Sequence, residues 1–366
     1  MARPAKPAST VKVRKGMPSV QITKEQFRER FYARYYDPDF EPLKKEIDAA
    51  LDMAWVNYDK YRKTPRTQKA GKGFADPDFN VPVEWLATRN AIAAAERKQK
   101  NPKSPPRILI VNGSSRSDQS CPGEMSKTWR MVMLAKEVVE KSRGFEVDIL
   151  DLSRLTSEYG RVIYPCKGCL STAQPLCHWP CSCYPNHAMA QTGDWMAEIY
   201  PMWAAAHGVM IVCPVNWYQA PSSLKLMMDR LVCADGGNPD YTSTGGKSPT
   251  KAKQLEFEGW PYPRHLAGRA FSVVVHGDAA GTENLRRILS DWLEDIGLIP
   301  SGHLGHIDRY IGYLGSYATS HDDYEADKDF QEDVRNAARA LVEAVRMLRK
   351  GKLVPPDRGL HEARPK

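Results

Sequence analysis

The chain has 366 residues, of which 42% are hydrophobic, and its formal net charge is +8. This length allows one large domain with a smaller one beside it, and the apolar content is enough for a sizeable core. No run of about 18 apolar residues is present, which argues against a membrane-spanning helix. The first residues also lack the apolar segment of a secretory signal, so we expect a cytoplasmic protein.

The positive charge is concentrated in the N-terminal third. The first 106 residues hold 22 Lys and Arg against 13 Asp and Glu, whereas the remainder holds 30 against 31. Basic segments can bind nucleic acid or anionic membranes. Here the cations alternate with acids, a pattern typical of a solvated arm or of an arm that wraps a neighbouring subunit. We therefore expect neither a nucleic-acid nor a membrane partner.

The N-terminal third is predicted to be helical after a disordered tail. Residues 1–22 are rich in Pro, Lys and Ser and form the predicted basic tail. The capping-box pattern Thr23–Gln26 opens a helix to about residue 36, and Asp39 is expected to cap a second helix. Residues 63–82 are predicted to be a loop and 83–98 a third helix. Together, residues 23–106 are interpreted as a helical extension and linker.

Aromatic side chains on these helices require a covering surface. We expect either the main domain or another subunit to supply that surface. The second alternative predicts a homodimer or homotetramer in which the helical arm clasps a neighbour.

The pattern changes at Arg107, where strands begin to alternate with helices. Arg107–Asn112 is a continuous apolar run that ends in Gly113, as expected of a buried parallel strand. Strands alternating with helices predict an α/β domain with a doubly wound, five-stranded parallel sheet in the order 2-1-3-4-5 over residues 107–350. The other expected elements are helix 126–142, strand 146–151, helix 194–206, strand 209–213, helix 221–233, strand 270–275, helix 282–296, edge strand 299–307, helix 323–349 and a C-terminal tail over 351–366.

The loop after the first strand has the composition of a phosphate site. It leads into a helix, whose first N–H groups are unpaired and whose dipole is positive at that end. The loop adds hydroxyl groups and two cations, from Ser114, Arg116, Ser126, Lys127 and Thr128. Neither a Walker A sequence nor G-x-G-x-x-G is present, which disfavours a nucleotide-triphosphate or conventional dinucleotide site.

Two further loops follow the third and fourth strands of the predicted sheet, and the third strand lies beside the first. Residues 214–218, Pro-Val-Asn-Trp-Tyr, offer aromatic faces and backbone N–H groups that suit a flat heteroaromatic ring. Residues 276–278, His-Gly-Asp, contain a glycine that permits close approach of the backbone to a ligand. Because the carboxyl ends of parallel strands meet at one edge, the three loops are expected to form a single crevice.

Together these motifs resemble the NADPH-dependent FMN reductase family of flavodoxin-like proteins. The resemblance rests on the glycine–serine–arginine loop, Cys213-Pro-x-x-x-Tyr218, the segment Ser222–Arg230 and the His-Gly-Asp loop, and it covers about residues 107–310. It implies FMN phosphate contacts from Ser114, Arg116, Ser126, Lys127 and Thr128. It also implies contacts to the flavin ring from Pro214, Val215, Asn216, Trp217, Tyr218, His276, Gly277 and Asp278.

Five cysteines crowd into an expected insertion at residues 164–187. Four thiolates can hold a [4Fe–4S] cluster or a zinc ion, so the candidate metal ligands are Cys166, Cys169, Cys177 and Cys181, with Cys183 as an alternative. The location matches that of the cysteine motif in iron–sulfur flavoproteins, although the spacing is wider. Unligated thiols, an iron–sulfur cluster and zinc all remain open at this point.

The expected activity is that of an FMN-dependent oxidoreductase. NAD(P)H would supply a hydride, and a flavin, quinone or similar small molecule would accept the electrons. No side chain is assigned as an acid or base, because the flavin itself carries the chemistry. The alternative is an iron–sulfur flavoprotein that carries electrons between protein partners.

Overall fold

A computed structural model describes residues 11–120 and 123–353. The described residues form two compact units, and each is composed of segments from separate parts of the chain. We call them the sheet unit and the insertion unit. The sheet unit contains residues 87–166, 195–237 and 261–353, and the insertion unit contains residues 11–86, 167–194 and 238–260.

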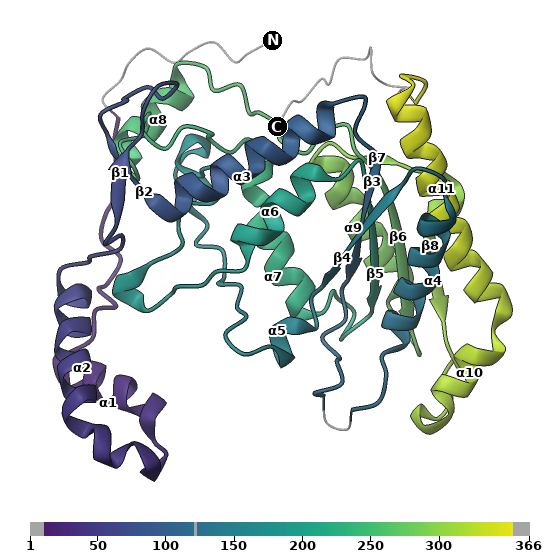
Figure 1. Ribbon diagram of the computed structural model, residues 1–366, viewed down its shortest axis with the longest axis horizontal. Coiled ribbons are helices and arrows are strands. Elements are labelled where there is room, and N and C mark those ends of the chain that lie inside the picture. The colour runs from purple at the N-terminus through teal and green to yellow at the C-terminus, as the bar shows by residue number, and fades with distance from the viewer. Residues whose placement is uncertain (1–10, 121–122, 354–366) are drawn as a thin grey trace. The chain divides into compact units, whose positions relative to one another are not determined.

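The sheet unit is built on a parallel sheet, as the strand–helix alternation predicts (Figure 1). Its strands lie in the order β4-β3-β5-β6, and both β7 and β8 pair with β6. Every strand pair in this sheet is parallel. The bounds are β3 Arg107–Asn112, β4 Glu146–Asp151, β5 Gly208–Pro214, β6 Ala270–Gly277, β7 Ile299–Pro300 and β8 His306–Tyr310.

The predicted flavodoxin-like α/β class is confirmed, with one difference in strand count. The sheet has six strands rather than five, because two short strands share the last position. β7 pairs with the start of β6 and β8 with its end, and the 3₁₀ turn His303–Gly305 lies between them. The predicted edge strand at 299–307 is thus interrupted, and its longer part extends to Tyr310.

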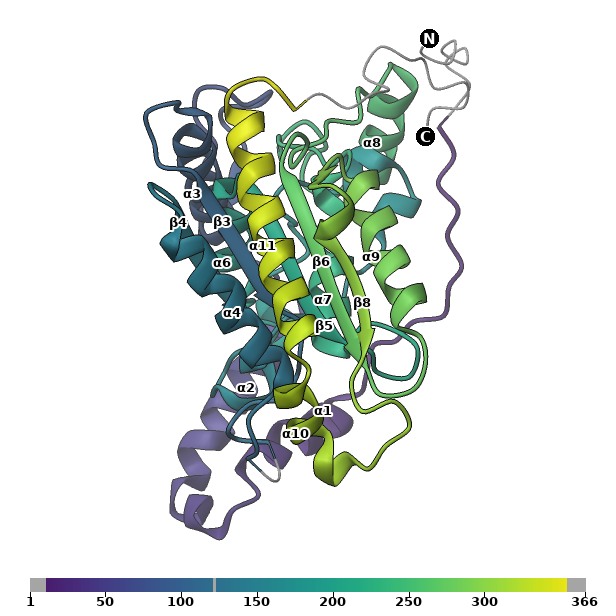
Figure 2. The same ribbon diagram turned by 90° about the vertical axis from the view of Figure 1, so that its right-hand side faces the viewer.

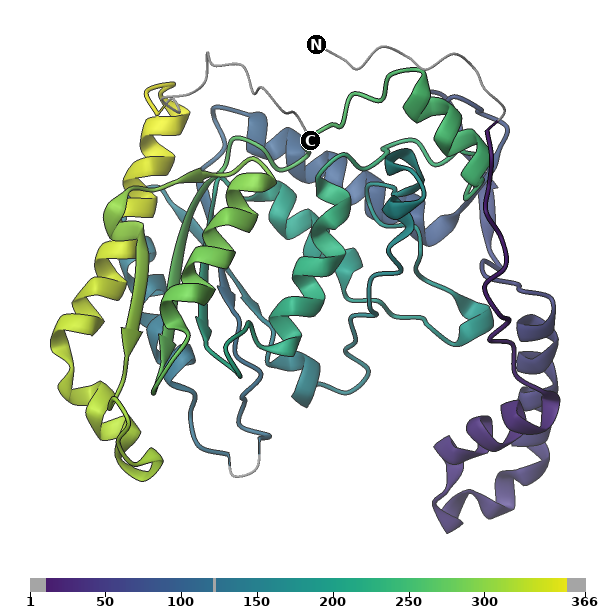
Figure 3. The same ribbon diagram turned by 180° about the vertical axis from the view of Figure 1, so that it is seen from behind.

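Helices cover both faces of the sheet. On one face lie α4 (Lys127–Lys141) and α11 (Lys328–Arg349), which pack against each other and against the sheet (Figure 2). On the other face lie α6 (Met196–Ala205), α7 (Ser222–Arg230) and α9 (Thr282–Asp295) (Figure 3). The short helices of this unit are α5 (Arg154–Ser157), α10 (Ser320–Ala326) and the 3₁₀ turns Leu231–Ala234 and Tyr317–Thr319.

The core of the sheet unit follows from the alternation of side chains along each strand. Ile108, Ile110, Met210 and Val212 face α4 and α11 and are fully buried. Gly208 permits the close approach of α11, because a Cβ atom there would lie 2.7 Å from Val345 Cγ2 and 3.0 Å from Leu341 Cδ1. The helix–sheet spacing therefore depends on a glycine at the start of β5.

The closing helix is divided, contrary to the prediction of one helix over 323–349. α10 ends at Ala326 and α11 begins at Lys328. The Asp327 side chain between them accepts a hydrogen bond from the backbone N–H of Phe330 at 2.8 Å, which caps α11. An aspartate competes with helix continuation in this way because its carboxylate satisfies the first free N–H groups.

The insertion unit contains the helical arm, a two-stranded sheet and the cysteine-rich segment. The Thr23 capping box is present at α1 (Lys24–Tyr32). The prediction for Asp39 is wrong: Asp37 caps the 3₁₀ helix Pro38–Leu43, and α2 (Lys44–Asp59) follows it directly. Residues 63–82 include the antiparallel strands β1 (Thr67–Lys69) and β2 (Asn80–Pro82), which the loop prediction missed.

Two more helices belong wholly or partly to this unit. α3 (Val83–Lys100) begins here and continues into the sheet unit, and α8 (Pro249–Phe257) was not predicted. The cysteine-rich segment itself has only the 3₁₀ turns Cys169–Ser171, Gln174–Leu176 and His187–Met189.

A small aromatic core holds the insertion unit together. Trp85 is 2% exposed, and its indole N–H donates to the carbonyl of Pro180 at 2.8 Å. Its ring lies 5.3 Å from that of Tyr241 and 6.4 Å from that of His178. The buried His178 imidazole lies between the hydroxyls of Ser182 and Thr244. The cysteine-rich segment is therefore tied to the N-terminal third through aromatic packing.

None of the described helices is both long and apolar enough to cross a lipid bilayer. Residues 1–10 and 354–366, which contain most of the two predicted tails, lie outside the described part of the chain. Residues 11–23 have no regular secondary structure. The predicted domains are continuous in sequence, with a boundary after residue 106. The two compact units are instead discontinuous, because the chain passes from one to the other after residues 86, 166, 194, 237 and 260.

Candidate functional site

A cleft of 580 Å³ opens at the carboxyl ends of the central strands. The loops after β3, β5 and β6 leave the same end of the sheet because these strands are parallel (Figure 1). This edge, beside the switch between β3 and β5, is where open α/β sheets bind their ligands. Its lining side chains belong to the sheet unit, and the volume lies in the range of small-molecule sites.

The β3–α4 loop brings hydroxyl groups and a helix N-terminus to one end of the cleft. Ser126 caps α4, and its hydroxyl accepts from the N–H of Trp129 at 3.4 Å. Ser114 is 4% exposed, and its hydroxyl accepts from the N–H of Arg116 at 3.1 Å. The remaining N–H groups of the first turn of α4 and the positive end of its dipole suit an anion.

Two cations stand at the same end of the cleft. Lys127 lies in the first turn of α4, and its ammonium group donates to the Ser320 hydroxyl at 2.7 Å. Burial lowers the pKa of Lys127, and nearby Arg116 lowers it further. Arg116 donates from Nε to the carbonyl of Glu124 at 2.8 Å. With the hydroxyls around them, these groups are donors of the kind that suits a phosphate monoester.

His276 is a buried neutral imidazole behind this donor set. It is 5% exposed, and its Nε2 lies 2.8 Å from the hydroxyl of Thr128. Burial, and then the charge of Lys127, lower the pKa of His276 to about 3. The imidazole is therefore uncharged at neutral pH, and it fixes the orientation of the Thr128 hydroxyl that lines the cleft.

The β5–α7 loop forms the opposite side of the cleft and ends in a tight turn. Pro214, Val215 and Asn216 line the cleft. Asn216 and Gln219 then exchange both backbone hydrogen bonds at 3.0 Å, with Trp217 and Tyr218 between them. Both central residues have positive φ, +49° and +65°, as a type I′ turn requires.

This turn is unusual because its two central residues are large aromatics. Such turns favour Asn-Gly, since left-handed backbone costs an ordinary L-residue roughly 1–2 kcal/mol. The Trp217 side chain is 95% exposed and that of Tyr218 62% exposed, so packing among the described residues does little to offset the cost. Gly281 makes room for the turn, because a Cβ atom there would lie 3.2 Å from the Cα of Tyr218.

The β8–α10 loop supplies a wall of the cleft that the sequence did not reveal. The hydroxyl of Tyr317 donates to the carboxylate of Asp278, and the N–H of Leu314 donates to the Asp278 carbonyl at 3.0 Å. His321 lies 3.5 Å from the carboxylate of Glu124. No motif marks this loop in the sequence, and only the pairing of β8 with β6 brings it to the cleft.

The sequence prediction missed eight lining residues, from both the β3–α4 loop and the segment after β8. They are Ser115, Ser120, Glu124, Met125, Ile311, Tyr317, Ser320 and His321.

Most of the predicted site residues line this one cleft. Eleven do so, from three loops: Ser114, Arg116, Ser126, Lys127, Thr128, Pro214, Val215, Asn216, His276, Gly277 and Asp278. Trp217 and Tyr218 follow Asn216 in the chain but do not line the cleft, and both are exposed. The convergence of separate loops is what the parallel order of the strands predicts.

The predicted metal ligands are divided between the two units. Cys169, Cys177, Cys181 and Cys183 belong to the insertion unit, whereas Cys166 is the last residue of a sheet-unit segment. The seven described cysteines form no disulfide. Among the described residues, no three His, Cys, Asp or Glu side chains are placed so that they could hold a metal ion. The ligand set stays a prediction.

Within the insertion unit the thiols lie near buried ammonium groups. Lys247 Nζ lies 3.4 Å from Cys169 Sγ and donates to the carbonyl of Leu176 at 2.7 Å. A hydrogen bond with the Cys177 thiol is the main cause that raises the pKa of Cys169 to about 11. Lys63 donates to the Ser182 carbonyl, and burial lowers its pKa.

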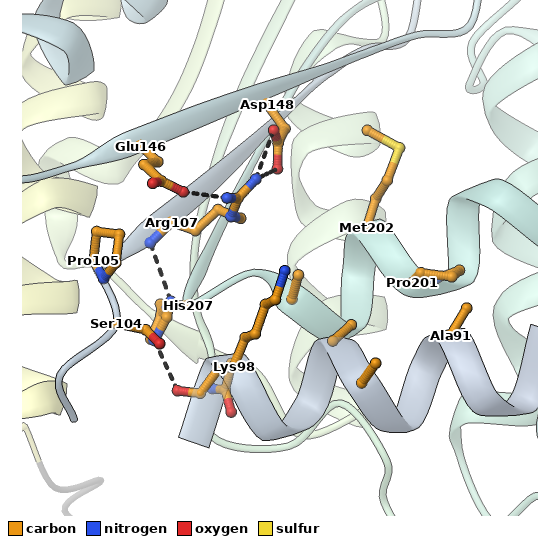
Figure 4. A pocket seen from close by; sticks show the side chains of 14 residues that line it. Ala91, Lys98, Ser104, Pro105, Arg107, Glu146, Asp148, Pro201, Met202 and His207 are labelled. Carbon is orange, nitrogen blue, oxygen red and sulfur yellow. Dashed lines mark hydrogen bonds and ion pairs between the residues drawn. The ribbon is translucent and has the colours of Figure 1, made fainter. Parts of the chain in front are cut away.

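A second cavity, of 740 Å³, lies at the opposite edge of the sheet (Figure 4). Arg107 donates to Asp148 at 2.7 and 2.9 Å and pairs with Glu146, so its charge is neutralised within the cavity wall. His207 accepts the Arg107 N–H at Nδ1 and lies 2.9 Å from the carbonyl of Gln99. Because Arg107 is paired with Asp148 and Glu146 and the cavity lies at the strand amino ends, we do not assign it as the functional site.

Comparison with known proteins identifies the family to which the chain belongs. Residues 106–301 match the model of the NADPH-dependent FMN reductase family. A curated iron–sulfur flavoprotein of Methanosarcina thermophila is 30% identical over 127 residues. That match covers 34% of this chain and 52% of the relative, so the chain spans about half the length of the curated relative it matches.

Solved structures with similar folds include flavin proteins. RosB with a bound riboflavin-phosphate intermediate has a TM-score of 0.46 and 14% identity, and the match covers 68% of this chain and 82% of RosB. An FMN-dependent NADH-azoreductase of Bacillus anthracis has a TM-score of 0.34 and 14% identity, covering 64% of this chain and 99% of the azoreductase. Because the family model spans more than half of the chain, this protein belongs to the NADPH-dependent FMN reductase family.

Proposed function

We propose that the protein binds FMN in the cleft and uses NAD(P)H to reduce a flavin, quinone or similar small acceptor. The observation that carries this proposal is the convergence of Ser114, Ser126, Thr128, Arg116 and Lys127 around the N-terminus of α4. This set combines hydroxyl, cationic and backbone donors, as a phosphate monoester requires. Membership of an FMN reductase family supports the choice of FMN as the phosphate-bearing cofactor.

The residues of the cleft divide into two groups by chemistry. Arg116 and Lys127 neutralise the phosphate charge, and Ser320 holds the ammonium group of Lys127 toward the cleft. Pro214, Val215 and Asn216 present backbone and small side chains on the opposite side, where a flat ring fits. His276 stays neutral and holds the Thr128 hydroxyl in place rather than exchanging protons.

Bound FMN supplies the redox chemistry by accepting and releasing a hydride. The protein contributes donors to the charge that the reduced ring carries. Val215 and Asn216 already donate their N–H groups to His276 and Gln219. These two N–H groups of the cleft wall are therefore satisfied within the fold and are not available to the ring.

An absorption spectrum recorded before and after anaerobic addition of NADPH tests this proposal. Flavin bands in the purified or FMN-loaded protein that bleach rapidly would support it. Flavin bands that persist would rule out NADPH as the electron donor, and a protein that binds no FMN would contradict the cofactor assignment. Repeating the measurement with NADH decides between the two nicotinamide donors.

A second candidate function is electron transfer between protein partners by an iron–sulfur flavoprotein. The similarity to the Methanosarcina protein of that name favours it, as do four thiols near the Lys247 ammonium group in one unit. Among the described residues, these thiols are not placed as a metal-ligand set. Iron and acid-labile sulfide in anaerobically purified protein, with slow NADPH turnover, would favour this function over the first.

We also propose a cytoplasmic location and a homodimer or homotetramer. Free thiols at all seven described cysteines fit a reducing compartment. Exposed aromatic and apolar side chains on the α1–α2 arm support self-association, and a test of this assembly is given in the Discussion.

A further inference from the structure

The chain after β8 is bonded to the opposite wall of the cleft at two places. We call residues 311–326, from the end of β8 through α10, the strap. Its Ser320 hydroxyl accepts from the ammonium group of Lys127 at 2.7 Å, and its His321 imidazole lies 3.5 Å from the carboxylate of Glu124. All four side chains line the cleft, at the end where the phosphate of FMN is proposed to bind.

A third contact joins the strap to α4 outside the cleft. The carboxylate of Glu325 on α10 pairs with the guanidinium group of Arg130, about one turn beyond Lys127 on α4. The Arg130 guanidinium also lies 6.0 Å from the centroid of the buried Tyr324 ring. Neither Arg130 nor Glu325 lines the cleft, so this pair holds α10 against α4 without meeting a ligand there.

The first part of the strap is bonded to the loop after β6. The Tyr317 hydroxyl donates to the carboxylate of Asp278, and the N–H of Leu314 donates to the Asp278 carbonyl at 3.0 Å. α10 itself lies at the end of the sheet toward which the strands run (Figure 2). The strap is therefore tied to the loop after β6 by its first part and to the β3–α4 loop and α4 by its second.

These contacts bear on the rates at which a ligand enters and leaves the cleft. A contact between protein groups that forms both with and without the ligand contributes equally to the two states, so it does not change the affinity. If the ligand passes only when that contact opens, the contact slows entry and exit by the same factor. Ser320 and His321 of the strap line the same end of the cleft as Lys127 and Arg116, so the strap is placed to limit the exchange of FMN.

We propose that the strap retains FMN as a resident cofactor, and that Arg130 and Glu325 are positioning residues that hold α10 over the phosphate end of the cleft. The inference rests on the proposed function, because it assumes that FMN occupies the cleft. It deepens that function by specifying which molecule exchanges. A flavin that dissociates more slowly than the enzyme turns over stays bound through many cycles, so the acceptor must be a second molecule even where that acceptor is free flavin.

The test compares the wild type with an Arg130→Gln/Glu325→Gln double variant. This change removes the ion pair and leaves the net charge unaltered, so the long-range attraction of the FMN phosphate is preserved. Association of FMN with the apoprotein is followed by stopped-flow quenching of flavin fluorescence, and release by the return of fluorescence after dilution. We expect both rate constants to rise about two- to fivefold, as the loss of one partly exposed ion pair allows, while Kd stays within about twofold. In the wild type, release should be slower than turnover with NADPH and menadione.

A rescue variant and a matched control accompany this comparison. Arg130→Glu/Glu325→Arg restores the ion pair in the reverse direction and should return both rate constants toward the wild-type values. The control is Arg309→Gln/Asp333→Asn, which removes a partly exposed ion pair of 2.8 Å between β8 and α11 and also conserves charge. Neither residue of this pair lines the cleft or contacts α4 through a printed bond, and both rate constants should match the wild type.

Three outcomes overturn the inference. Unchanged rate constants in a stable, FMN-loaded double variant would show that the strap does not limit exchange. A faster release matched by an equal rise in Kd would mean that the pair supports the bound phosphate rather than closing the cleft. Release from the wild type that is faster than turnover would make FMN an exchanging substrate. In each of these cases FMN still binds, whereas a wild type that binds no FMN contradicts the proposed function and the inference together.

Discussion

At the scale of single residues, we expect the charge of Lys127 to matter most for the proposed binding of FMN. Its ammonium group lies in the cleft at the first turn of α4, where burial has already lowered its pKa. Lys127→Gln should weaken FMN binding to the apoprotein by about tenfold or more, because a hydrogen bond to a charged group contributes roughly 1.5–3 kcal/mol. Quenching of FMN fluorescence on titration measures this affinity.

The control for that substitution lies on the same helix. Lys136 does not line the cleft, is half-buried, and pairs with Glu140 one turn later, at 2.6 Å. Lys136→Gln should leave FMN affinity within about twofold of the wild type, since exposed pairs contribute little. Equal losses in the two variants would indicate a general electrostatic effect and contradict a specific phosphate contact by Lys127.

Two buried histidines in the sheet unit make its stability depend on pH. The pKa of His276 is lowered to about 3 and that of His207 to about 4, in both cases mainly by burial. Both values lie below the value of about 6.5 in an unfolded chain, which therefore binds protons that the folded protein does not. Stability is complete above about pH 6.5 and is lost as the pH falls from there toward 4.

The expected loss can be measured by urea unfolding. The slope for each histidine approaches about 1.4 kcal/mol per pH unit below pH 6.5, so the pair should lower the free energy of unfolding by roughly 3 kcal/mol between pH 6.5 and pH 5. His276→Gln keeps a hydrogen-bonding partner for Thr128 and does not titrate. This variant should lose roughly 1.5 kcal/mol less than the wild type over the same interval, and an unaltered pH dependence would contradict the assignment.

At the scale of elements, the contact between β5 and α11 depends on Gly208. A methyl group there would meet Val345 and Leu341, both fully buried. Gly208→Ala should therefore destabilise the protein by about 1–3 kcal/mol through overpacking. Chemical denaturation of this variant, of Val345→Ala and of the double variant provides the measurement.

The double variant is decisive because Val345→Ala removes the methyl group that clashes. Gly208→Ala and Val345→Ala together should cost less than the sum of the two single substitutions. Additive losses would mean that the residues do not limit how closely the helix approaches the sheet.

At the scale of the whole molecule, the α1–α2 arm presents apolar surface to solvent. Tyr36 is 92% exposed and Met53 is 61% exposed, while Phe27 packs against Trp55 and Tyr58 inside the helix pair. If the arm clasps a second copy of the chain, Tyr36→Ser/Met53→Ser should lower the mass measured by light scattering. Tyr159→Ser, in the sheet unit and equally exposed, is the control and should leave the mass unchanged. A mass that is the same in all three proteins would contradict this role.

Local patterns were sufficient for elements whose side chains obey a clear periodicity or capping rule. The strand Arg107–Asn112, the Ser126 cap and the Thr23 capping box are found where the sequence predicts them. The boundary at Asp327 and the cap at Asp37 were missed, because several acidic residues nearby satisfy the same local rule. β1 and β2 were missed because each is only three residues long and forms only by pairing with the other.

The sequence by itself determined the fold class and eleven of the residues that line the cleft. It did so because the alternation of strands and helices indicates a parallel α/β sheet, and such a sheet places its functional loops at strand carboxyl ends. Only the tertiary structure showed that the β8–α10 loop lines the cleft and that Trp217 and Tyr218 are exposed outside the cleft lining. It also showed that Cys166 belongs to a different unit from Cys169, Cys177, Cys181 and Cys183. These features depend on long-range pairing and on backbone conformation, which the periodicity of side chains does not encode.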